Sequence, residues 1–420
     1  MDALKICGQE PLSGTIDISG SKNATLPIMA ATILAPGKSR LGRVPDLADV
    51  RTLQRVLTHL GIKIEHDGPE LTLDATDITE LEAPYELVRT MRASILVLGP
   101  LLARFGKARV SLPGGCAIGA RPIDQHLKGL KKLGAVITLE HGYVEAKADK
   151  LIGAEIIFDM PTVGGTEHLM IAASLAEGTT VLRNAAREPE IVDLALVLRK
   201  MGVDIQGEGT ERITIVGQKE LKPFDHDVVA DRIEFGTFLI AGAMTGENLT
   251  LRGGVIEHQT ALLDKLIQAG TKVSIDKEKN EITVSRPKQL EPVNIKTAPY
   301  PGFPTDMQAQ MMTLMCAAEG TSVITETIFE NRFMHVAELG RLGAKIRVDG
   351  GKAIVDGGKE LSGTTVMATD LRASASLILA GLVADGETII RRIYHLDRGY
   401  EHIEDKLRSV GAKIERFKEE

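Results

Sequence analysis

The feature that most constrains how this chain folds is a pattern that recurs six times along its 420 residues. In each copy an amphipathic helical segment ends at a glycine and alternating β-branched residues follow, as in HLKGLKKLGAVITL. The six glycines stand 68 to 73 residues apart, at Gly61, Gly134, Gly202, Gly270, Gly343 and Gly411. Glycine tolerates the left-handed conformation that ends a helix, and β-branched residues favour a strand after it.

A second helical segment begins about 40 residues before each of these glycines. Segments such as GTEHLMIAASLAEG and RIEFGTFLIAGAMTG are apolar on almost every face, which indicates buried helices. Short β-rich stretches follow them, so each repeat is α, β, α, β with further strands. The period exceeds the ~20–50 residues of solenoid repeats. We therefore expect an α/β protein with two domains of three repeats, each with buried helices surrounded by sheets and outer helices.

Composition excludes several classes of partner. A net charge of −7 disfavours nucleic acid, and no apolar run approaches the ~20 residues that span a bilayer. The three cysteines are too far apart for a disulfide framework or a zinc site. The first residues resemble no signal peptide, so the cytoplasm is the expected compartment. Small anions remain possible ligands, provided that a few basic side chains converge in a cleft.

The buried helices are expected to begin near charged residues, namely Lys22, Arg92, Glu167, Arg232, Asp306 and Arg372. Free N–H groups at a helix start suit an anion, and three parallel helices would bring three such starts to one face. The alternative is that these residues only cap the helices, although a cation opposes the helix dipole at that end. For Lys22, in GSKNA, anion binding and a solvated lysine are equally open.

The segment PGGCAIGARPID at 113–124 indicates an irregular loop, because glycines and prolines interrupt both helix and strand. Small neighbours leave the thiol of Cys116 uncovered, and Arg121 could lower its pKa toward neutrality. We therefore expect Cys116 to act as an acid or a nucleophile. Cys316, in the apolar run MMTLMCAA, and Cys7 are expected to be structural. No GxSxG signature of a serine hydrolase occurs.

Four further motifs contain acidic residues, and three of them also place an arginine beside the acidic residue. YPGFPTDMQAQ brings Asp306 to a helix start, where it is either a cap or a general base. FENRFMH, TDLRAS and LDRGYEH each set an arginine beside an acidic residue, at Arg332, Arg372 and Arg398. Such pairs are usually surface ion pairs of small energetic value. Their similar positions in three repeats favour an anion-binding cleft instead.

These motifs together resemble the UDP-N-acetylglucosamine 1-carboxyvinyltransferases, enolpyruvyl transferases of the EPSP synthase superfamily. The resemblance rests on GSKNATLPIMAATIL, PGGCAIGARPIDQHLKGLKKLGA, PTVGGTEHLMIAA, YPGFPTDMQAQ, FENRFMHVAEL and TDLRASASLILAGL, and it extends over the whole chain. It implies two inside-out α/β barrels, each of three βαβαββ repeats. It also implies one domain at 21–230 with the Cys116 loop, a second formed by 1–20 and 231–420, and an active site in the interdomain cleft.

The resemblance further implies a reaction. Enolpyruvate passes from phosphoenolpyruvate to the 3′-hydroxyl of UDP-N-acetylglucosamine by addition and elimination, with release of phosphate, as the first committed step of peptidoglycan synthesis. The chemistry needs an acid, a base and cationic groups, so no metal or cofactor is expected. The expected partners are these two small molecules, with no obligate protein partner.

Residue roles also follow from the resemblance. Cys116 is expected to be the proton donor and the site of a covalent phosphoenolpyruvate adduct, and Asp306 either the base or the group that positions the hydroxyl. Lys22, Arg121 and Arg398 are expected to bind phosphoenolpyruvate, with Asn23 and Arg92 nearby. The expected nucleotide contacts are Arg121, Pro122, Ile123, Asp124, Gln125, Val163, Gly164 and Ile328. Arg332, Asp370 and Arg372 complete the polar wall. His168 and Met160 depart from the residues expected at those positions in many relatives.

Two other functions remain as alternatives. One is enolpyruvyl transfer to shikimate 3-phosphate, although the loop cysteine followed by RP-x-D separates the two enzymes. The other is a non-catalytic sensor of nucleotide sugars on the same fold. A binding protein needs no acid, so the set of Lys22, Cys116, Asp306 and Arg398 favours an enzyme.

Overall fold

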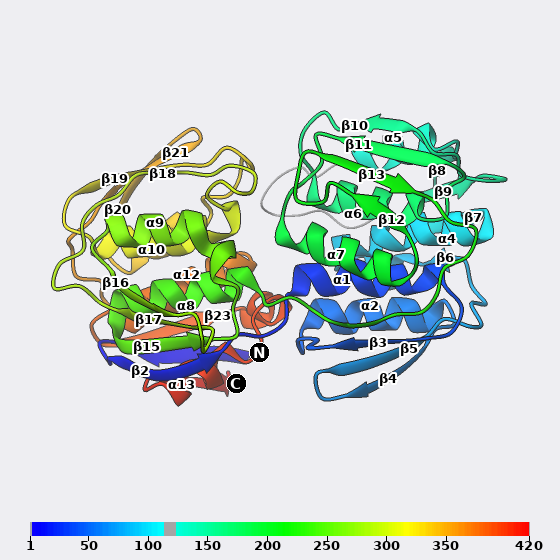
Figure 1. Cartoon of the computed structure of the whole chain (residues 1–420). Coiled ribbons are helices and arrows are strands. Elements are labelled where there is room, and N and C mark those ends of the chain that lie inside the picture. The colour runs from blue at the N-terminus through cyan, green and yellow to red at the C-terminus, as the bar shows by residue number, and fades with distance from the viewer. Residues whose placement is uncertain (1, 113–122, 420) are drawn as a thin grey trace. The chain divides into compact units, whose positions relative to one another are not determined.

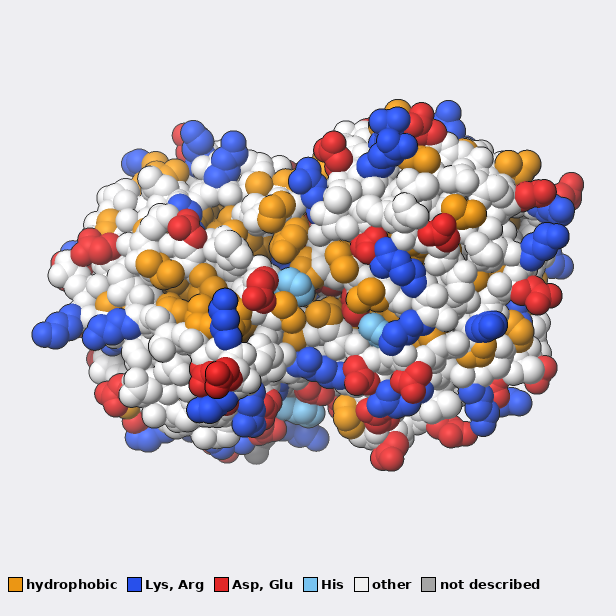
Figure 2. Space-filling view, in the orientation of Figure 1, with side chains coloured by type: hydrophobic (Ala, Val, Ile, Leu, Met, Phe, Trp, Pro, Cys, Tyr) orange, Lys and Arg blue, Asp and Glu red, His pale blue; other side chains and the backbone are white. Residues whose placement is uncertain are grey.

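The computed structural model describes residues 2–112 and 123–419. These residues form two compact units, each with its own hydrophobic core. The central unit extends from Gly20 to Val229, and the terminal unit combines the residues up to Ser19 with those from Ala230 onward. Figure 2 shows Lys and Arg side chains interspersed with Asp and Glu over the visible face. Among the described helices, none has the length and apolar character needed to cross a membrane.

Each unit contains three four-stranded sheets built to one plan (Figure 1). The first strand pairs in parallel with the second, and the remaining two pairs are antiparallel. In the central unit the orders are β14(Asp225–Asp227)-β3(Lys38–Gly42)-β5(Glu70–Asp74)-β4(Lys63–Asp67), β6(Glu82–Ala83)-β7(Lys107–Ser111)-β9(Tyr143–Lys147)-β8(Val136–Glu140) and β10(Glu155–Ile157)-β11(Thr179–Arg183)-β13(Arg212–Val216)-β12(Asp204–Gln206). In the terminal unit they are β2(Leu12–Asp17)-β15(Gly246–Arg252)-β17(Glu281–Ser285)-β16(Lys272–Asp276), β18(Ile295–Lys296)-β19(Thr321–Thr325)-β21(Lys352–Asp356)-β20(Lys345–Asp349) and β22(Thr365–Met367)-β23(Glu387–Arg391)-β1(Asp2–Cys7)-β24(Lys413–Lys418).

The inner helices are buried along nearly their whole length, as their uniformly apolar sequences predict. They are α1(Lys22–Ala31), α4(Leu98–Phe105) and α6(Val163–Ala173) in the central unit, and α8(Arg232–Thr245), α10(Gln308–Ala317) and α12(Leu371–Val383) in the terminal unit. Short 3₁₀ turns, η2(Arg92–Val97) and η4(Thr305–Met307), precede α4 and α10. The outer helices are α2(Ala48–His59), α5(Asp124–Lys132), α7(Pro189–Lys200), α9(Thr260–Gln268), α11(Val336–Arg341) and α13(Ile403–Ser409). The remaining short elements are η1(Thr32–Leu34), α3(Tyr85–Val88), η3(Ile256–Gln259) and η5(Ile393–Arg398).

Four repeats have the order βαβαββ along the chain, and the other two take one strand, β14 or β1, from elsewhere in the sequence. The predicted α/β fold with buried inner helices is confirmed. Three of the six sheets include a strand that is distant in the sequence. β1 lies between β23 and β24, β2 pairs with β15, and β14 pairs with β3. The periodicity of the glycines contains no information on these three pairings.

The six predicted glycines end the outer helices as expected. Their φ angles lie between +89° and +109°, a region that side chains rarely enter. The backbone N–H that follows each glycine returns to a carbonyl of the helix, as in the 3.0 Å bond from Ile62 to Leu57 and the 3.1 Å bond from Ala344 to Leu339. These are the closing hydrogen bonds of a Schellman motif, which satisfies the last carbonyl groups of a helix.

Two glycines near the end of α11 allow a matched test of this role. Gly343 has φ +97°, whereas Gly340 is helical and exposed, with open space where a Cβ would lie. We expect Gly343→Ala to lower the free energy of unfolding by about 1–2 kcal/mol, because alanine is strained in the left-handed region. Gly340→Ala should raise that free energy by about 0.5–1 kcal/mol, because alanine is the better helix former. Urea unfolding of both variants measures the difference; equal shifts would contradict the assignment.

Candidate active site

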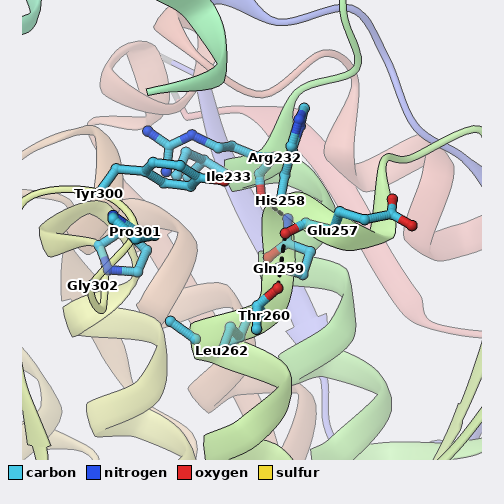
Figure 3. A pocket seen from close by; sticks show the side chains of 12 residues that line it. Arg232, Ile233, Glu257, His258, Gln259, Thr260, Leu262, Tyr300, Pro301 and Gly302 are labelled. Atoms are coloured by element: carbon cyan, nitrogen blue, oxygen red, sulfur yellow. Dashed lines mark hydrogen bonds between the residues drawn. The ribbon is translucent and has the colours of Figure 1, made fainter. Parts of the chain in front are cut away.

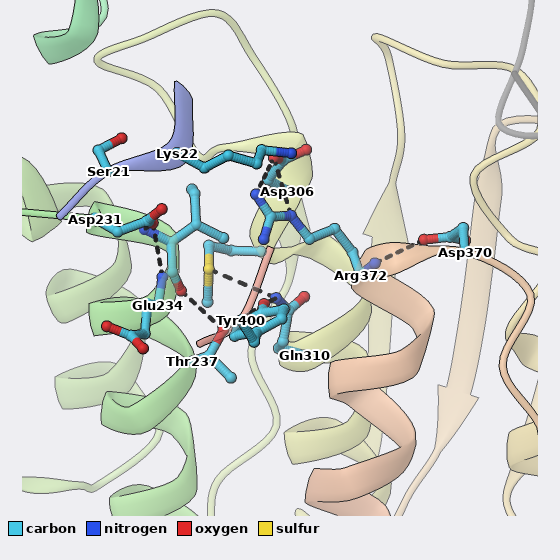
Figure 4. Close-up of polar contacts among 12 residues, drawn as sticks. Ser21, Lys22, Asp231, Glu234, Thr237, Asp306, Gln310, Asp370, Arg372 and Tyr400 are labelled. Carbon is cyan, nitrogen blue, oxygen red and sulfur yellow. Dashed lines mark hydrogen bonds and ion pairs between the residues drawn. The ribbon is translucent and has the colours of Figure 1, made fainter. Parts of the chain in front are cut away.

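The starts of the three inner helices of the terminal unit meet in one polar cluster. Figure 4 shows Asp231, Asp306, Asp370 and Arg372, which come from the starts of α8, η4 and α12. Asp231 and Asp370 cap α8 and α12, each accepting two backbone N–H bonds of 2.8 and 3.0 Å. For this unit, the prediction that parallel inner helices bring their charged starts to one face is confirmed.

Asp306 is held by two arginines at the centre of this cluster. Its Oδ1 accepts a 2.8 Å hydrogen bond from Arg332 Nη2, and its Oδ2 accepts bonds of 2.9 and 3.1 Å from Nη2 and Nε of Arg372. The Asp306 side chain is 27% exposed, whereas those of Arg332 and Arg372 are 3% and 4% exposed. Asp306 makes no capping bond to its helix, so these pairs are neither a helix cap nor surface ion pairs.

The two arginines retain hydrogen-bonding capacity. The Nη1 atoms of Arg332 and Arg372 are buried and lack a hydrogen-bond partner among the described residues. Burial disfavours the charged form of Arg372, but Asp306, Tyr400 and Asp231 outweigh it and raise the pKa of this guanidinium. Because buried donors are normally satisfied, the two Nη1 groups are suited to an anionic ligand.

The ring of Tyr400 packs against the guanidinium group of Arg372. Its ring centroid lies 5.4 Å from the Arg372 guanidinium carbon, and its hydroxyl lies 2.9 Å from Thr237 Oγ1 and 3.1 Å from Gln310 Nε2. The side chains of Thr237 and Gln310 come from α8 and α10, so all three inner helices help to orient Arg372. The sequence motif LDRGYEH contains Tyr400, but nothing in it indicated this contact.

The carboxylate of Glu326 links three chain segments near Asp306. Its carboxylate accepts 2.9 Å bonds from the hydroxyls of Thr297 and Thr305 and a 2.7 Å bond from the backbone N–H of Ile328. Thr305 is the residue before Asp306, so Glu326 ties the predicted nucleotide contact Ile328 to the start of η4. Glu326 was not among the residues predicted from the sequence.

His335 and Arg398 also belong to this region of the terminal unit. Burial, the largest effect, lowers the pKa of His335 to about 4 despite the opposing charge of Asp370. The imidazole is therefore neutral near pH 7. Arg398 ends η5, and after burial its charge is the next cause of the lowered pKa of His395.

A small pocket lies beside the start of α8 (Figure 3). Its walls include Glu257 and His258 from η3, the loop at Tyr300 and Pro301, and Arg232 from α8. The Arg232 guanidinium carbon lies 5.8 Å from the centroid of the Tyr300 ring. Arg232 thus lines this pocket.

In the central unit, Lys22 and Asn23 begin α1. Lys22 Nζ lies 3.4 Å from Asp49 Oδ2 on α2, and both side chains are buried. The interpretation of Lys22 as a solvated lysine is therefore wrong. Arg92 begins η2, and its charge acts on His126, the third residue of α5.

The predicted nucleotide contacts of the central unit that the structure describes lie at two neighbouring helix starts. Ile123 precedes α5, which begins at Asp124, and α6 begins at Val163 and Gly164. Gln125 exchanges hydrogen bonds of 3.2 and 3.3 Å with Asp159, so its side chain is engaged within the unit. Cys116, Arg121 and Pro122 lie outside the described residues.

The prediction that Glu167 begins a buried helix is wrong. Thr162 caps α6 through a 3.2 Å bond from Gly165 N–H, and Glu167 lies in the second turn. Its side chain is buried, and its Oε1 has no hydrogen-bond partner in the described part of the chain. Burial, with added repulsion from Glu190 and Glu188, raises its pKa well above the usual range. Burial thus favours the neutral form of the Glu167 carboxyl group inside the core.

A model of the EPSP synthase (3-phosphoshikimate 1-carboxyvinyltransferase) family matches residues 6–407. The UDP-N-acetylglucosamine 1-carboxyvinyltransferases of Geobacter metallireducens and Geotalea uraniireducens are 60% and 61% identical to this chain over 419 residues. Each alignment covers 100% of this chain and 100% of the relative. The enolpyruvyl transferase NikO of Streptomyces tendae superposes with a TM-score of 0.90 and 29% identity, covering 100% of this chain and 99% of that one. An EPSP synthase of Acinetobacter baumannii shares the fold at a TM-score of 0.77, with 19% identity and 100% of both chains covered.

The buried acid Glu167 predicts a pH dependence of stability. Its pKa is raised in the folded chain, so above pH ~4.5 the unfolded chain releases this proton while the folded chain retains it. The free energy of unfolding therefore falls with rising pH. Glu167→Gln removes this contribution, so we expect the variant to become more stable relative to wild type as the pH rises above ~4.5.

Urea unfolding at several pH values measures this effect. The same substitution at Glu177, which is exposed, controls for the loss of one negative charge from the unit. A stability difference between Glu167→Gln and wild type that is constant with pH would contradict the neutral form of Glu167.

Proposed function

The chain belongs to the EPSP synthase family, and we infer that it transfers the enolpyruvyl group of phosphoenolpyruvate to UDP-N-acetylglucosamine. The observation that carries this conclusion is identity of about 60% over the full chain with enzymes of that name. The reaction releases inorganic phosphate and commits the sugar to peptidoglycan synthesis. Shikimate 3-phosphate is the weaker acceptor candidate, because the EPSP synthase of Acinetobacter baumannii is only 19% identical to this chain.

The Asp306 cluster favours catalysis over simple sensing. Two buried arginines fix both carboxylate oxygens of Asp306, while the carboxylate itself stays accessible. An ionised carboxylate only accepts hydrogen bonds, so a substrate hydroxyl can donate to it. We propose that Asp306 binds the 3′-hydroxyl of the sugar, orients it, and receives its proton during attack.

The remaining steps follow from the chemistry of the vinyl group. The Cys116 thiol protonates C3 of phosphoenolpyruvate, and C2 becomes an oxocarbenium-like centre that the 3′-oxygen attacks. The tetrahedral intermediate then loses a proton from C3, and phosphate leaves with the electrons of the C2–O bond. Cys116 can also add to C2 as a nucleophile, which gives the covalent adduct.

Cationic residues are proposed to neutralise the substrates. Lys22, Arg121 and Arg398 bind phosphoenolpyruvate and its phosphate, with Asn23 and Arg92 beside them, and Arg332, Asp370 and Arg372 form the polar wall. Ile123, Asp124, Gln125, Val163, Gly164 and Ile328 contact the nucleotide together with Arg121 and Pro122. We propose that residues of both domains act on one substrate pair in an interdomain cleft.

Two further properties are part of this proposal. Both substrates are metabolites of the cytoplasm, which is therefore the proposed place of action. The reaction as proposed needs only the two small molecules and no protein partner.

Phosphate release with two acceptors tests the proposed function. With phosphoenolpyruvate present, we expect UDP-N-acetylglucosamine to elicit phosphate release and shikimate 3-phosphate to elicit none. Phosphate release with shikimate 3-phosphate alone would assign the chain to the other reaction. Tight binding of UDP-N-acetylglucosamine without any phosphate release would indicate a sensor.

Asp306→Asn tests the role of the clamped carboxylate. The amide oxygen can accept from only one of the two arginines, and the amide cannot take a proton, so we expect the rate of phosphate release to fall ~100-fold or more. Asp349→Asn, an exposed position at the end of β20 in the same unit, is the matched control and should keep the wild-type rate. A rate for Asp306→Asn within three-fold of wild type would exclude Asp306 as the base.

Thiol reactivity tests the role of Cys116. Burial raises the pKa of the Cys316 thiol to about 12, so this thiol is an internal control that should stay unmodified in the folded protein. We expect the epoxide fosfomycin to alkylate the peptide that contains Cys116, as detected by peptide mass spectrometry. Cys116→Ser should turn over far more slowly, because a hydroxyl is a weaker acid than a thiol. An unmodified Cys116 peptide, or normal turnover of the serine variant, would remove the thiol from the mechanism.

A further inference from the structure

Two buried histidines of the central unit form a hydrogen-bonded chain that the reaction above does not use. The backbone N–H of Gly99, in α4, lies 2.7 Å from Nε2 of His168, in α6. Nδ1 of His168 lies 3.0 Å from Nδ1 of His126, in α5. The exposed fractions of His168 and His126 are 0% and 6%. The chain therefore links three helices of one unit.

The direction of this chain is fixed at its Gly99 end. A backbone amide can only donate, so Nε2 of His168 is unprotonated and the proton of that ring is on Nδ1. This Nδ1–H donates to Nδ1 of His126, which must therefore accept, and the proton of His126 is on Nε2. If His126 were doubly protonated, its Nδ1–H would point at the Nδ1–H of His168, and no hydrogen bond could form between the two rings. The pKa shifts agree, because burial, with the added charge of Arg92, lowers the pKa of His126 to about 4.

The residues packed around His168 restrict the position of its ring. A Cβ on Gly99 would lie 2.7 Å from both Cδ2 and Nε2 of the His168 ring, so the close approach requires a glycine. Burial, followed by the effect of His126, lowers the pKa of His168 well below its usual range. His168 is thus a rigid, neutral ring with no contact to solvent.

The outer edge of His126 lies where a nucleotide contact was predicted. A Cβ placed on Gly164 would be 3.5 Å from Cε1 and 3.7 Å from Nε2 of His126. The hydrogen bond of the His126 ring to His168 is made by Nδ1, whereas Nε2 lies on the side of the ring near Gly164. Gly164 is in the first turn of α6, whose N–H groups and dipole favour an anion, and the charge of Arg92 acts on the same ring. A phosphate oxygen is the acceptor that best matches these three groups.

We propose that His126 donates its Nε2–H to a diphosphate oxygen of UDP-N-acetylglucosamine, and that His168 is the positioning residue that fixes this tautomer. The inference rests on the proposed function for the identity of the nucleotide, but the tautomers follow from the geometry alone. A histidine locked in this way is a permanent neutral donor, so its hydrogen bond does not depend on protonation near neutral pH.

The first test reads the tautomers directly. Long-range ¹H–¹⁵N spectra of histidine-labelled protein at pH 7 distinguish Nε2–H, Nδ1–H and imidazolium rings, and the His126→Phe and His168→Asn variants assign the signals. We expect His126 in the Nε2–H form and His168 in the Nδ1–H form. An imidazolium or an Nδ1–H ring at His126 would overturn the inference, whether or not the protein is an active transferase.

The second test distinguishes the contributions of the two ring nitrogens of His168. Asparagine places an amide where Nδ1 lies and can still donate to His126, whereas glutamine places its amide where Nε2 lies and keeps only the contact with Gly99. We expect His168→Gln and His126→Phe to raise the Kd for UDP and the KM for UDP-N-acetylglucosamine ~10-fold. His168→Asn should stay within about three-fold of wild type. His59→Gln, at an exposed position of α2, is the control and should bind UDP as wild type does.

The outcomes distinguish the inference from the proposed function. Calorimetry measures UDP binding without turnover, and thermal unfolding verifies that each variant is folded. Equal UDP binding by folded His168→Gln, His126→Phe and wild type would overturn the inference even if the wild type is active. A parallel rise of the KM for phosphoenolpyruvate in His168→Gln would also overturn it, since it would indicate a general structural role. Absence of phosphate release in the wild type would refute only the proposed function.

Discussion

The structure depends on the burial of six inner helices along nearly their whole length. A helix surrounded by sheets and other helices can present polar groups to a ligand mainly at its ends, where the backbone N–H groups also lack helical partners. The sequence meets this constraint with Asp231 and Asp370 as caps and with charged side chains beside them. The polar chemistry of each unit is therefore concentrated at the starts of its inner helices, and the candidate site is a consequence of how the core is packed.

The Asp306 cluster shows how this constraint serves a reaction of anions. Asp306 lies between the guanidiniums of Arg332 and Arg372, so these three side chains together carry a net positive charge although the chain as a whole is acidic. Tyr400, Thr237 and Gln310 hold Arg372 from the core side, which leaves little freedom at the carboxylate. Preorganised charge of this kind stabilises developing charge in a transition state without reorganisation during the reaction. It suits an addition–elimination in which phosphate leaves.

The local features of the fold could be predicted from the sequence, and the long-range ones could not. Glycine at the ends of the outer helices and uniformly apolar inner segments are local signals, and both predicted their elements. The start of α6 was misplaced because Gly164 and Gly165 suggest a loop, whereas Thr162 caps the helix before them. The pairing of Lys22 with Asp49 spans 27 residues, and that of His126 with His168 spans 42, so no local pattern indicates either. The insertion of β1 between β23 and β24 cannot be predicted from the repeat period either, because β1 is distant from both strands in the sequence.

The central claim is that enolpyruvyl transfer proceeds by protonation of C3 of phosphoenolpyruvate, attack at C2 and elimination. The most direct measurement is product analysis by mass spectrometry and NMR after turnover in D₂O. If C3 becomes a methyl group in the intermediate, one of its hydrogens derives from solvent, and deuterium must appear in the vinyl methylene of the enolpyruvyl product. An enolpyruvyl ether of the sugar without deuterium at that carbon, or no such product, would contradict the account.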